Sequence, residues 1–241
     1  FLVAFRLPNT FRRLFAEGTF NSAFIPSYTS EKIKNKKNGK KFADDVLSLL
    51  ILSLLIIVLI VEIFTPYLVY IIAPGFYDNS QKFNLAVELT RITFPFLLFV
   101  SLSSFFSGIL NSNNKFAAAA AAPIILNIIL ILSLLISYFL QLDFATNLSY
   151  GVTLSGIIQL VFLIYFTNKY YKPLIKIKIF ISAKVKFFIK KLLPSIFSSG
   201  VTQINILIGT IIASFQTGAV SYLYYADRIY QINLAIAGIA V

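Results

Sequence analysis

The chain has 241 residues, of which 58% are hydrophobic and 12% charged, and it carries a formal net charge of +12. A soluble domain is about half apolar, whereas here the apolar residues form blocks of membrane-spanning length, such as LLILSLLIIVLIV within 42–72. The chain has no Cys and no His, which excludes disulfides, thiolate ligands and the residues that most often bind zinc or relay protons. We therefore expect an all-α, polytopic membrane protein.

In chain order, the apolar blocks predict seven membrane helices separated by short polar turns. These helices are 1–29, 42–72, 82–110, 117–140, 144–168, 185–214 and 218–241. Several prolines fall within or near them, which predicts irregular helices whose freed carbonyl groups are satisfied by neighbouring side chains. A run of six alanines at 117–122 predicts a smooth surface for close helix packing.

Lysines in the connections predict the orientation of the helices in the membrane. Six lysines lie in 30–41, eight in 168–191 and one at Lys115, and these three connections share one side if the helices alternate. The connections on the other side contain a single lysine, Lys82. By the positive-inside rule, loops 30–41, 111–115 and 168–191 are expected to be cytoplasmic.

The net positive charge has two interpretations. Nucleic-acid binding expects arginines and aromatic residues clustered on a soluble face, whereas these lysines lie beside membrane helices. Topology and attraction to anionic membrane lipids account for them, so we expect membrane lipids and no nucleic acid as partners. The segment 173–191 mixes Lys with Ile and Phe, which also fits an amphipathic helix lying in the membrane interface.

A few charges fall inside predicted membrane helices, where each is costly. Arg12, Arg13 and Glu17 lie in one stretch, and Glu17 is one helical turn from Arg13. They fit either a polar cavity or an arginine pair that reaches the lipid phosphates. Apolar sequence on both sides favours the cavity. Asp227 and Arg228 form a second group among tyrosines, which fits a cavity or an interfacial position equally well.

Residues typical of catalysis are almost absent. The chain has no Gly-rich phosphate loop with GK[ST] and no nucleophile system built on Cys or His. Asp44-Asp45 is the one adjacent acidic pair, at a predicted helix start, where carboxylates favour the helix dipole. We therefore expect no enzyme activity, no catalytic residues, no metal and no cofactor.

Four blocks, in this order, resemble the MurJ (MviN) family of lipid II flippases. They are VAFRLPNTFRRLFAEGTFNSAFIPSY at 3–28, APGF at 73–76, RITFPF at 91–96 with SGILN at 107–111, and SYLYYADRIYQ at 221–231. The first block is long and specific, and together the blocks cover essentially the whole chain.

The resemblance implies a two-lobe helical bundle of the multidrug/oligosaccharidyl-lipid/polysaccharide exporter superfamily. It divides the chain into a first lobe at 1–168, a basic linker at 169–184 and the start of a second lobe at 185–241. It implies a transporter in the bacterial inner membrane that flips lipid II, an undecaprenyl-diphosphate-linked disaccharide-peptide, to the periplasmic leaflet by alternating access. The substrate-binding residues implied are Arg12, Arg13, Glu17 and Arg228, the arginines holding the diphosphate.

The resemblance also leads us to expect a fragment that lacks the family's first helix and most of the second lobe, since the chain contains no Met. A five-residue similarity between 3–7 and 225–229 fits two related lobes. Three alternatives remain: a polysaccharide-lipid flippase or drug exporter of the same superfamily, a membrane scaffold without transport activity, and a membrane-embedded enzyme acting on lipid-linked sugars.

Overall fold

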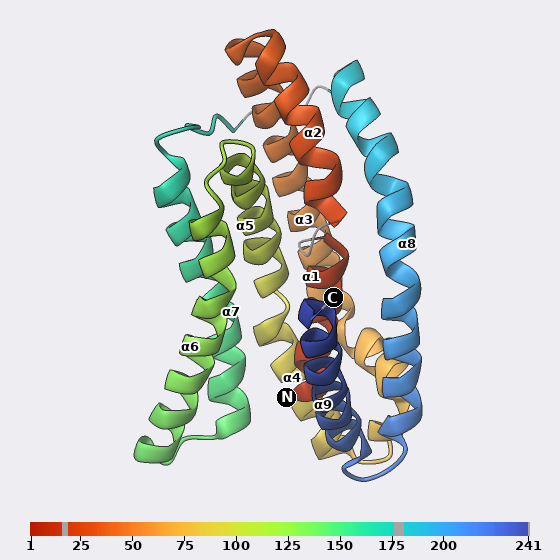
Figure 1. The fold of residues 1–241 in the computed structure, drawn as a ribbon. Helices are drawn as coiled ribbons and strands as arrows, with labels where there is room; N and C mark the ends of the chain where they lie inside the picture. Colours follow the sequence, from red (N-terminus) through yellow and green to blue (C-terminus); the bar gives the residue numbers. More distant parts are fainter. Residues whose placement is uncertain (16–18, 176–180, 241) are drawn as a thin grey trace.

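The structure is a bundle of α-helices that run side by side along one long axis (Figure 1). This computed structural model describes residues 1–15, 19–175 and 181–240, and the side chains of 13–15, 198, 199, 202 and 233–240 lie outside the description. Over those ranges the chain forms no strand. The helices are α1 (Leu2–Phe15), α2 (Thr19–Lys34), α3 (Lys36–Ile72), the 3-10 turn η1 (Pro74–Phe76), α4 (Ser80–Thr93), α5 (Phe96–Asn111), α6 (Phe116–Leu140), α7 (Phe144–Thr167), α8 (Ala183–Ser214) and α9 (Ala219–Ala240).

Four helical stretches have the length and composition of membrane spans: Lys36–Ile72, Ser80–Asn111, Phe116–Leu140 and Phe144–Thr167. Their outward faces carry large exposed apolar side chains, such as Leu59 on α3 and Ile131 on α6. A belt of this kind is stable where lipid replaces water. The expectation of an all-α, polytopic membrane protein is confirmed.

The helix expected over 82–110 is divided in the structure into α4 and α5. The helix expected over 1–29 corresponds to α1 and α2, with residues 16–18 outside the described part of the chain. Pro95 explains the break between α4 and α5 because it has no N–H to continue the α4 hydrogen-bond ladder. The hydroxyl of Thr153 on α7 donates a hydrogen bond to the carbonyl of Ile92 near this break.

The expectation of a loop at 30–41 is wrong, because this segment forms a helical hairpin. α2 continues to Lys34 and α3 begins at Lys36, so that Asn35 alone separates them. The Asn35 side chain accepts a hydrogen bond from the backbone N–H of Lys37 at 2.9 Å and caps α3. Lysine is a good helix former, so a lysine-rich connection between two helices can itself be helical.

The second lysine-rich connection is irregular where it is described. Residues 171–175 are not helical, and α8 begins at Ala183 with Ser182 as its cap. Lysines 176 and 178 lie outside the described residues. The interfacial helix considered over 173–191 is therefore not continuous. Residues 183–191 are instead the first residues of α8.

Two of the prolines inside the helices, Pro8 and Pro66, have nearby hydroxyl groups that replace the missing N–H. Pro8 leaves the carbonyl of Ala4 without its helical donor, and the buried Thr93 on α4 donates to that carbonyl at 3.0 Å. In α3, Thr65 donates to the carbonyl of Glu62 at 3.1 Å, one turn before Pro66. These bonds allow bent helices to persist in an apolar environment.

An aromatic core joins α8 to the other helices. Phe188 of α8 lies against Phe24 of α2 and Phe42 of α3, with ring centroids 6.2 and 6.0 Å away. Val185 is buried in the same cluster. The start of the predicted second lobe thus packs directly on the predicted first lobe, and the lobe division itself stays a prediction.

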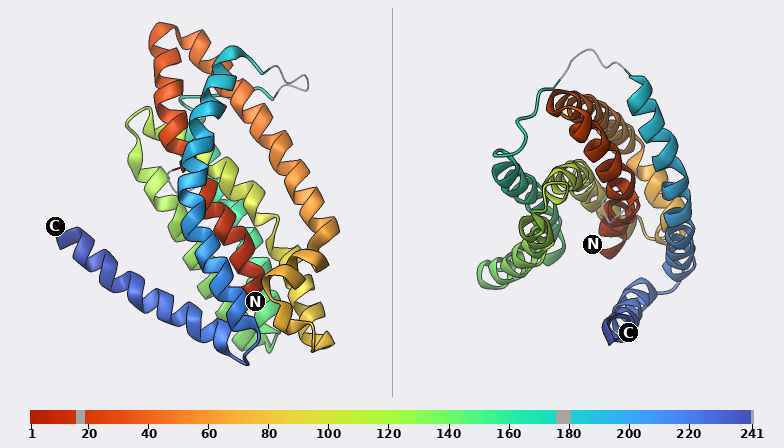
Figure 2. Two further views of the ribbon diagram at one scale, coloured as in Figure 1. Left: turned by 90° about the vertical axis from the view of Figure 1, so that its right-hand side faces the viewer. Right: turned by 45° about the horizontal axis from the view of Figure 1, so that its top comes forward.

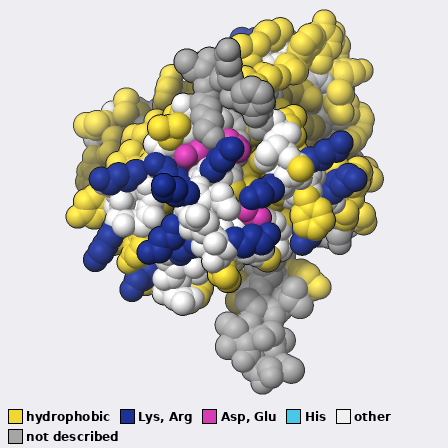
Figure 3. Space-filling view, turned by 90° about the horizontal axis from the view of Figure 1, so that it is seen from above, with side chains coloured by type: hydrophobic (Ala, Val, Ile, Leu, Met, Phe, Trp, Pro, Cys, Tyr) yellow, Lys and Arg dark blue, Asp and Glu magenta, His cyan; other side chains and the backbone are white. Residues whose placement is uncertain are grey.

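The two ends of the bundle differ in charge. The α2–α3 hairpin, the α5–α6 turn and the start of α8 lie together at the top of Figure 1. Seen from that side, many basic side chains gather across the centre of the surface and acidic side chains are few (Figure 3). We call this the lysine-rich end. At the opposite end, α9 leaves α8 and runs obliquely away from the bundle (Figure 2).

Candidate functional site

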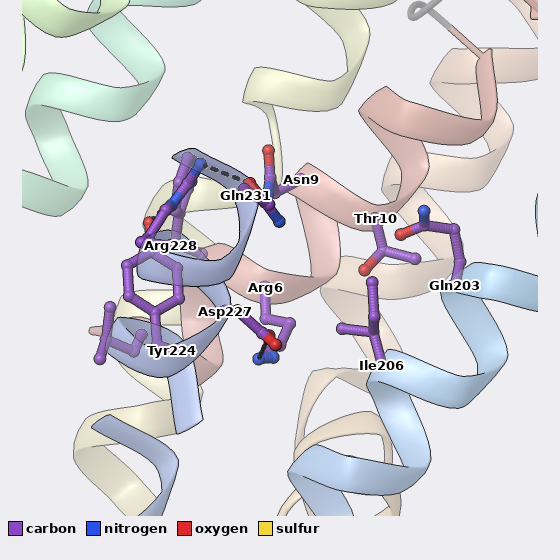
Figure 4. A pocket seen from close by; sticks show the side chains of 11 residues that line it. Arg6, Asn9, Thr10, Gln203, Ile206, Tyr224, Asp227, Arg228 and Gln231 are labelled. Atoms are coloured by element: carbon purple, nitrogen blue, oxygen red, sulfur yellow. Dashed lines mark hydrogen bonds and ion pairs between the residues drawn. The ribbon is translucent and has the colours of Figure 1, made fainter. Parts of the chain in front are cut away.

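Polar side chains from α1, α8 and α9 meet where α9 crosses α1 (Figure 4). The spacing of these residues explains why they share one place: each set recurs every three or four positions and so lies on one helix face. The set consists of Arg6, Asn9 and Thr10 on α1, Gln203 on α8, and Tyr224, Asp227, Arg228 and Gln231 on α9. The cavity between them has a volume of about 30 Å³, which is room for a water molecule. We call it the inter-helix cavity.

An ion pair joins the two sides of this cavity. Nη2 of Arg6 lies 3.7 Å from Oδ2 of Asp227, and the side chains are 7% and 43% exposed. The distance exceeds that of a charge-assisted hydrogen bond, so this contact is mainly Coulombic. It connects residues that are far apart in the sequence and ties α9 to α1.

Arg228 lies beside this pair and is held by its own helix. Its Nη2 donates to the hydroxyl of Tyr224 at 2.9 Å, and its Nη1 donates to Oε1 of Gln231 at 3.3 Å. Its guanidinium also lies over the Tyr224 ring, 5.1 Å from the centroid. These contacts orient an exposed arginine at the edge of the cavity.

Arg12 lines a different cavity. That cavity has a volume of about 350 Å³ and is bounded by α5, α6 and α7, with polar groups such as Ser103 and Gln159 on its wall. Nε of Arg12 donates to Oδ1 of Asn9 at 3.0 Å, and Asn9 also lines the inter-helix cavity. Arg12 and Arg228 therefore do not share one cavity in this structure. The Asn9 side chain connects the two places, because it lines the cavity of Arg228 and accepts the hydrogen bond from Arg12.

Two of the sequence-predicted site residues cannot be placed. Arg13 belongs to α1, but its side chain lies outside the described residues, and Glu17 lies outside them entirely. The structure adds Arg6, Asn9, Asp227 and Gln231 to the candidates. The sequence signal for Asp227 and Gln231 was the polar stripe at 224, 227, 228 and 231, and that for Arg6 and Asn9 was the polar set at 6, 9 and 10; both follow helical spacing.

The arginines give this site groups that are chemically suited to bind anions. Arginine is always charged and presents a planar fork of donors that matches phosphate oxygens. Within the part of the chain that the structure describes, no group of three or more His, Cys, Asp or Glu side chains is placed to hold a metal ion.

Comparison with known proteins gives one consistent result. The family described as "Lipid II flippase MurJ" matches residues 1–241. The probable lipid II flippase MurJ of Rickettsia prowazekii is 43% identical over 98% of this chain and 46% of its own length. The corresponding protein of Rhizobium tropici is 42% identical over 100% of this chain and 46% of its length.

A solved structure described as "Lipid II flippase MurJ, inward closed conformation" has a TM-score of 0.79 and 28% identity, over 95% of this chain and 47% of that one. The chain thus spans about half the length of the curated relatives that it matches. With the family match over every residue, the chain belongs to the MurJ lipid II flippase family.

Proposed function

We propose that this chain is part of a transporter that flips lipid II across the bacterial inner membrane, from the cytoplasmic to the periplasmic leaflet. Family membership supports the proposal. The observation that carries it is that arginines of α1 and α9 line two polar cavities, Arg6 and Arg228 in one and Arg12 in the other, in a chain with four helical stretches of membrane-spanning length and composition. The activity belongs to the whole protein, of which this chain corresponds to about half of its relatives' length.

The proposed role of the arginines is to hold the diphosphate of the substrate. Arg12, Arg13 and Arg228 are the residues concerned, because a diphosphate crossing an apolar region needs compensating charge. Asn9 and Tyr224 already bond two of these arginines and could exchange those bonds for phosphate oxygens. Glu17 would compete with the substrate for an arginine and so favour release.

The proposed mechanism is alternating access of two lobes. The inter-helix cavity, at about 30 Å³, is far smaller than the 300–1,000 Å³ typical of ligand sites. Substrate would therefore enter only after α9 separates from α1. The Arg6–Asp227 pair spans this boundary and would have to break in that step.

The proposed orientation places the lysine-rich end in the cytoplasm. The described parts of the three connections that carry the lysines lie at that end (Figure 1), as the positive-inside rule requires of cytoplasmic loops. Single cysteines at Lys37 and Ala219 test the orientation with an impermeant thiol reagent. Labelling of the cysteine at 37 from the periplasmic side would reverse the assignment.

The main test is complementation of a flippase-depleted cell by the full-length protein. Arg12→Ala, Arg13→Ala and Arg228→Ala should each impair flipping about ten- to a hundredfold, because a hydrogen bond to a charged group is worth roughly 1.5–3 kcal/mol. Lys37→Ala, an exposed change at the lysine-rich end, should have no effect, because its charge is screened by water and salt. Full growth of the Arg12→Ala and Arg13→Ala strains at normal protein level would refute the role of the arginines.

A further inference from the structure

A second charged cavity lies at the lysine-rich end, away from the arginines. Its volume is about 590 Å³, and we call it the basic pocket. Five lysines line it: Lys32 from α2, Lys36 and Lys40 from α3, and Lys169 and Lys172 from the segment after α7. Three tyrosines and two asparagines complete the described lining, which contains no acidic residue.

The α2–α3 hairpin fixes one wall of the basic pocket. A Cβ atom at Gly39 would lie 2.9 Å from Cα of Lys32, so the absence of a side chain at 39 allows the two helices to approach this closely. Lys32 donates a hydrogen bond from Nζ to Oδ1 of Asn113. Asn113 is in turn held by a bond of 2.7 Å from its Nδ2 to the carbonyl of Ile109.

A buried carboxylate fixes the other wall. The hydroxyl of Tyr171 donates to Oδ1 of Asp44 at 2.7 Å, and the backbone N–H of Leu174 donates to the same oxygen at 3.1 Å. Tyr171 is buried, and burial together with the nearby Asp44 carboxylate raises the pKa of its hydroxyl. These bonds hold Lys169 and Lys172, which flank Tyr171, beside the hairpin. The pocket is therefore built by side chains that are themselves ordered.

On the other side of α2, an acidic residue balances part of the lysine charge of this end. Glu31 forms ion pairs with Lys34, at 3.3 Å, and with Lys184. Glu31 also lines the cavity on that side, so its cations are partly neutralised. Five lysines and, among the described residues, no carboxylate line the basic pocket. Asp44, which is bonded to the lining residue Tyr171, supplies one negative charge against these five cations, so the concave site attracts anions.

Position relative to the apolar belt indicates the kind of anion. On α3 the large exposed apolar side chains run from Leu52 to Ile71, well after the start of the helix at Lys36. The lysine-rich end, where α3 begins, therefore lies at the depth of lipid headgroups. Basic pockets between membrane helices at this depth suit lipids with phosphate headgroups, and tyrosines favour the same interface. We propose that the basic pocket binds the phosphate headgroup of an anionic membrane lipid. This inference rests on the membrane fold and does not depend on flippase activity.

The test uses the full-length protein in nanodiscs of phosphatidylcholine with cardiolipin as the anionic probe, and measures retained cardiolipin by native mass spectrometry. The triple variant Lys36→Gln, Lys169→Gln, Lys172→Gln should lose about tenfold or more in cardiolipin affinity. A control triple at Lys37, Lys41 and Lys186, all exposed at the same end and outside the basic pocket, removes the same charge and should change affinity less than about twofold. Lysine-to-arginine changes at the pocket positions should preserve binding.

An equal loss of cardiolipin affinity in the pocket triple and the control triple would overturn the inference. The positive charge of the whole lysine-rich end would then explain the binding without a specific pocket. A second arm adds inorganic pyrophosphate to nanodiscs of phosphatidylcholine alone. Pocket-dependent binding of pyrophosphate without any pocket-dependent binding of cardiolipin would overturn the assignment to a lipid. Unchanged thermal unfolding of the pocket triple confirms that its loss of affinity is not a loss of fold.

Discussion

Removing the ion pair between Arg6 and Asp227 should increase the fraction of molecules in which α1 and α9 are separated, by a factor that can be calculated from the structure. Two unit charges near 4 Å apart interact by about 1 kcal/mol in water and by about 4 kcal/mol at an effective dielectric constant of about 20. Arg6 is buried, but Asp227 is 43% exposed at a distance of 3.7 Å, so solvent screening places the pair near the lower value. Asp227→Asn should therefore raise the population of separated α1 and α9 about fivefold.

The assay is the labelling rate of a cysteine at Thr10, which lines the cavity and is 6% exposed, in a cysteine-free background. Reagent reaches this position when the helices separate, so the rate follows the open population. Asp143→Asn, at the α6–α7 turn, removes one charge, and its amide oxygen can still cap α7, so it should leave the rate unchanged. In an Arg6→Gln background, Asp227→Asn should have no further effect. An equal acceleration in both backgrounds would show that the pair does not hold α9.

Three further changes test the packing. Thr93→Val removes the donor to the Ala4 carbonyl and should lower the stability by about 1–3 kcal/mol, seen as a lower thermal midpoint in detergent that Thr93→Ser restores. Gly75→Ala places a Cβ 2.4 Å from a backbone oxygen of α8 and should cost about 1–3 kcal/mol, whereas Gly209→Ala meets one side-chain atom at 3.4 Å and should be tolerated in the same measurement. Hydrogen bonds and ion pairs with Lys184 and Lys34 lower the pKa of Glu31. These ion pairs therefore stabilise the fold at pH values above the ordinary carboxyl pKa, and this stabilisation is lost as the pH falls through the lowered pKa. The difference in thermal midpoint between wild type and Glu31→Gln should accordingly shrink on acidification.

Hydropathy predicted the fold class and most of the helix positions, because apolar length in a membrane is a strong constraint. The break between α4 and α5 was not predicted, although Pro95 offered a signal for it, since the missing N–H interrupts the ladder. The helical hairpin at 30–41 was missed for another reason: polarity was taken as the sign of a loop, although lysine favours helix and Asn35 is a suitable cap.

The candidate site was predictable only in part. Arg12 and Arg228 were expected from the sequence, but their separation into two cavities depends on how α1 and α9 cross. Arg6 and Asp227 were visible within motifs, yet no local pattern pairs residues at opposite ends of the chain. The similarity of 3–7 to 225–229 aligns Arg6 with Arg228, whereas in the structure Arg6 pairs with the preceding residue, Asp227.

Asn9 lines the inter-helix cavity and is bonded to an arginine that lines the larger one, and this position makes the two cavities chemically dependent on each other. Its Oδ1 accepts the hydrogen bond from Nε of Arg12, while the residue shares the α1 side of the inter-helix cavity with Arg6 and has Arg228 of α9 on the other side. An anion that takes over the guanidinium of Arg12 would leave this amide oxygen without that donor, at the boundary where α9 must part from α1. An anion in the larger cavity would thus change a hydrogen bond at the inter-helix cavity directly, because the Asn9 side chain alone connects the two.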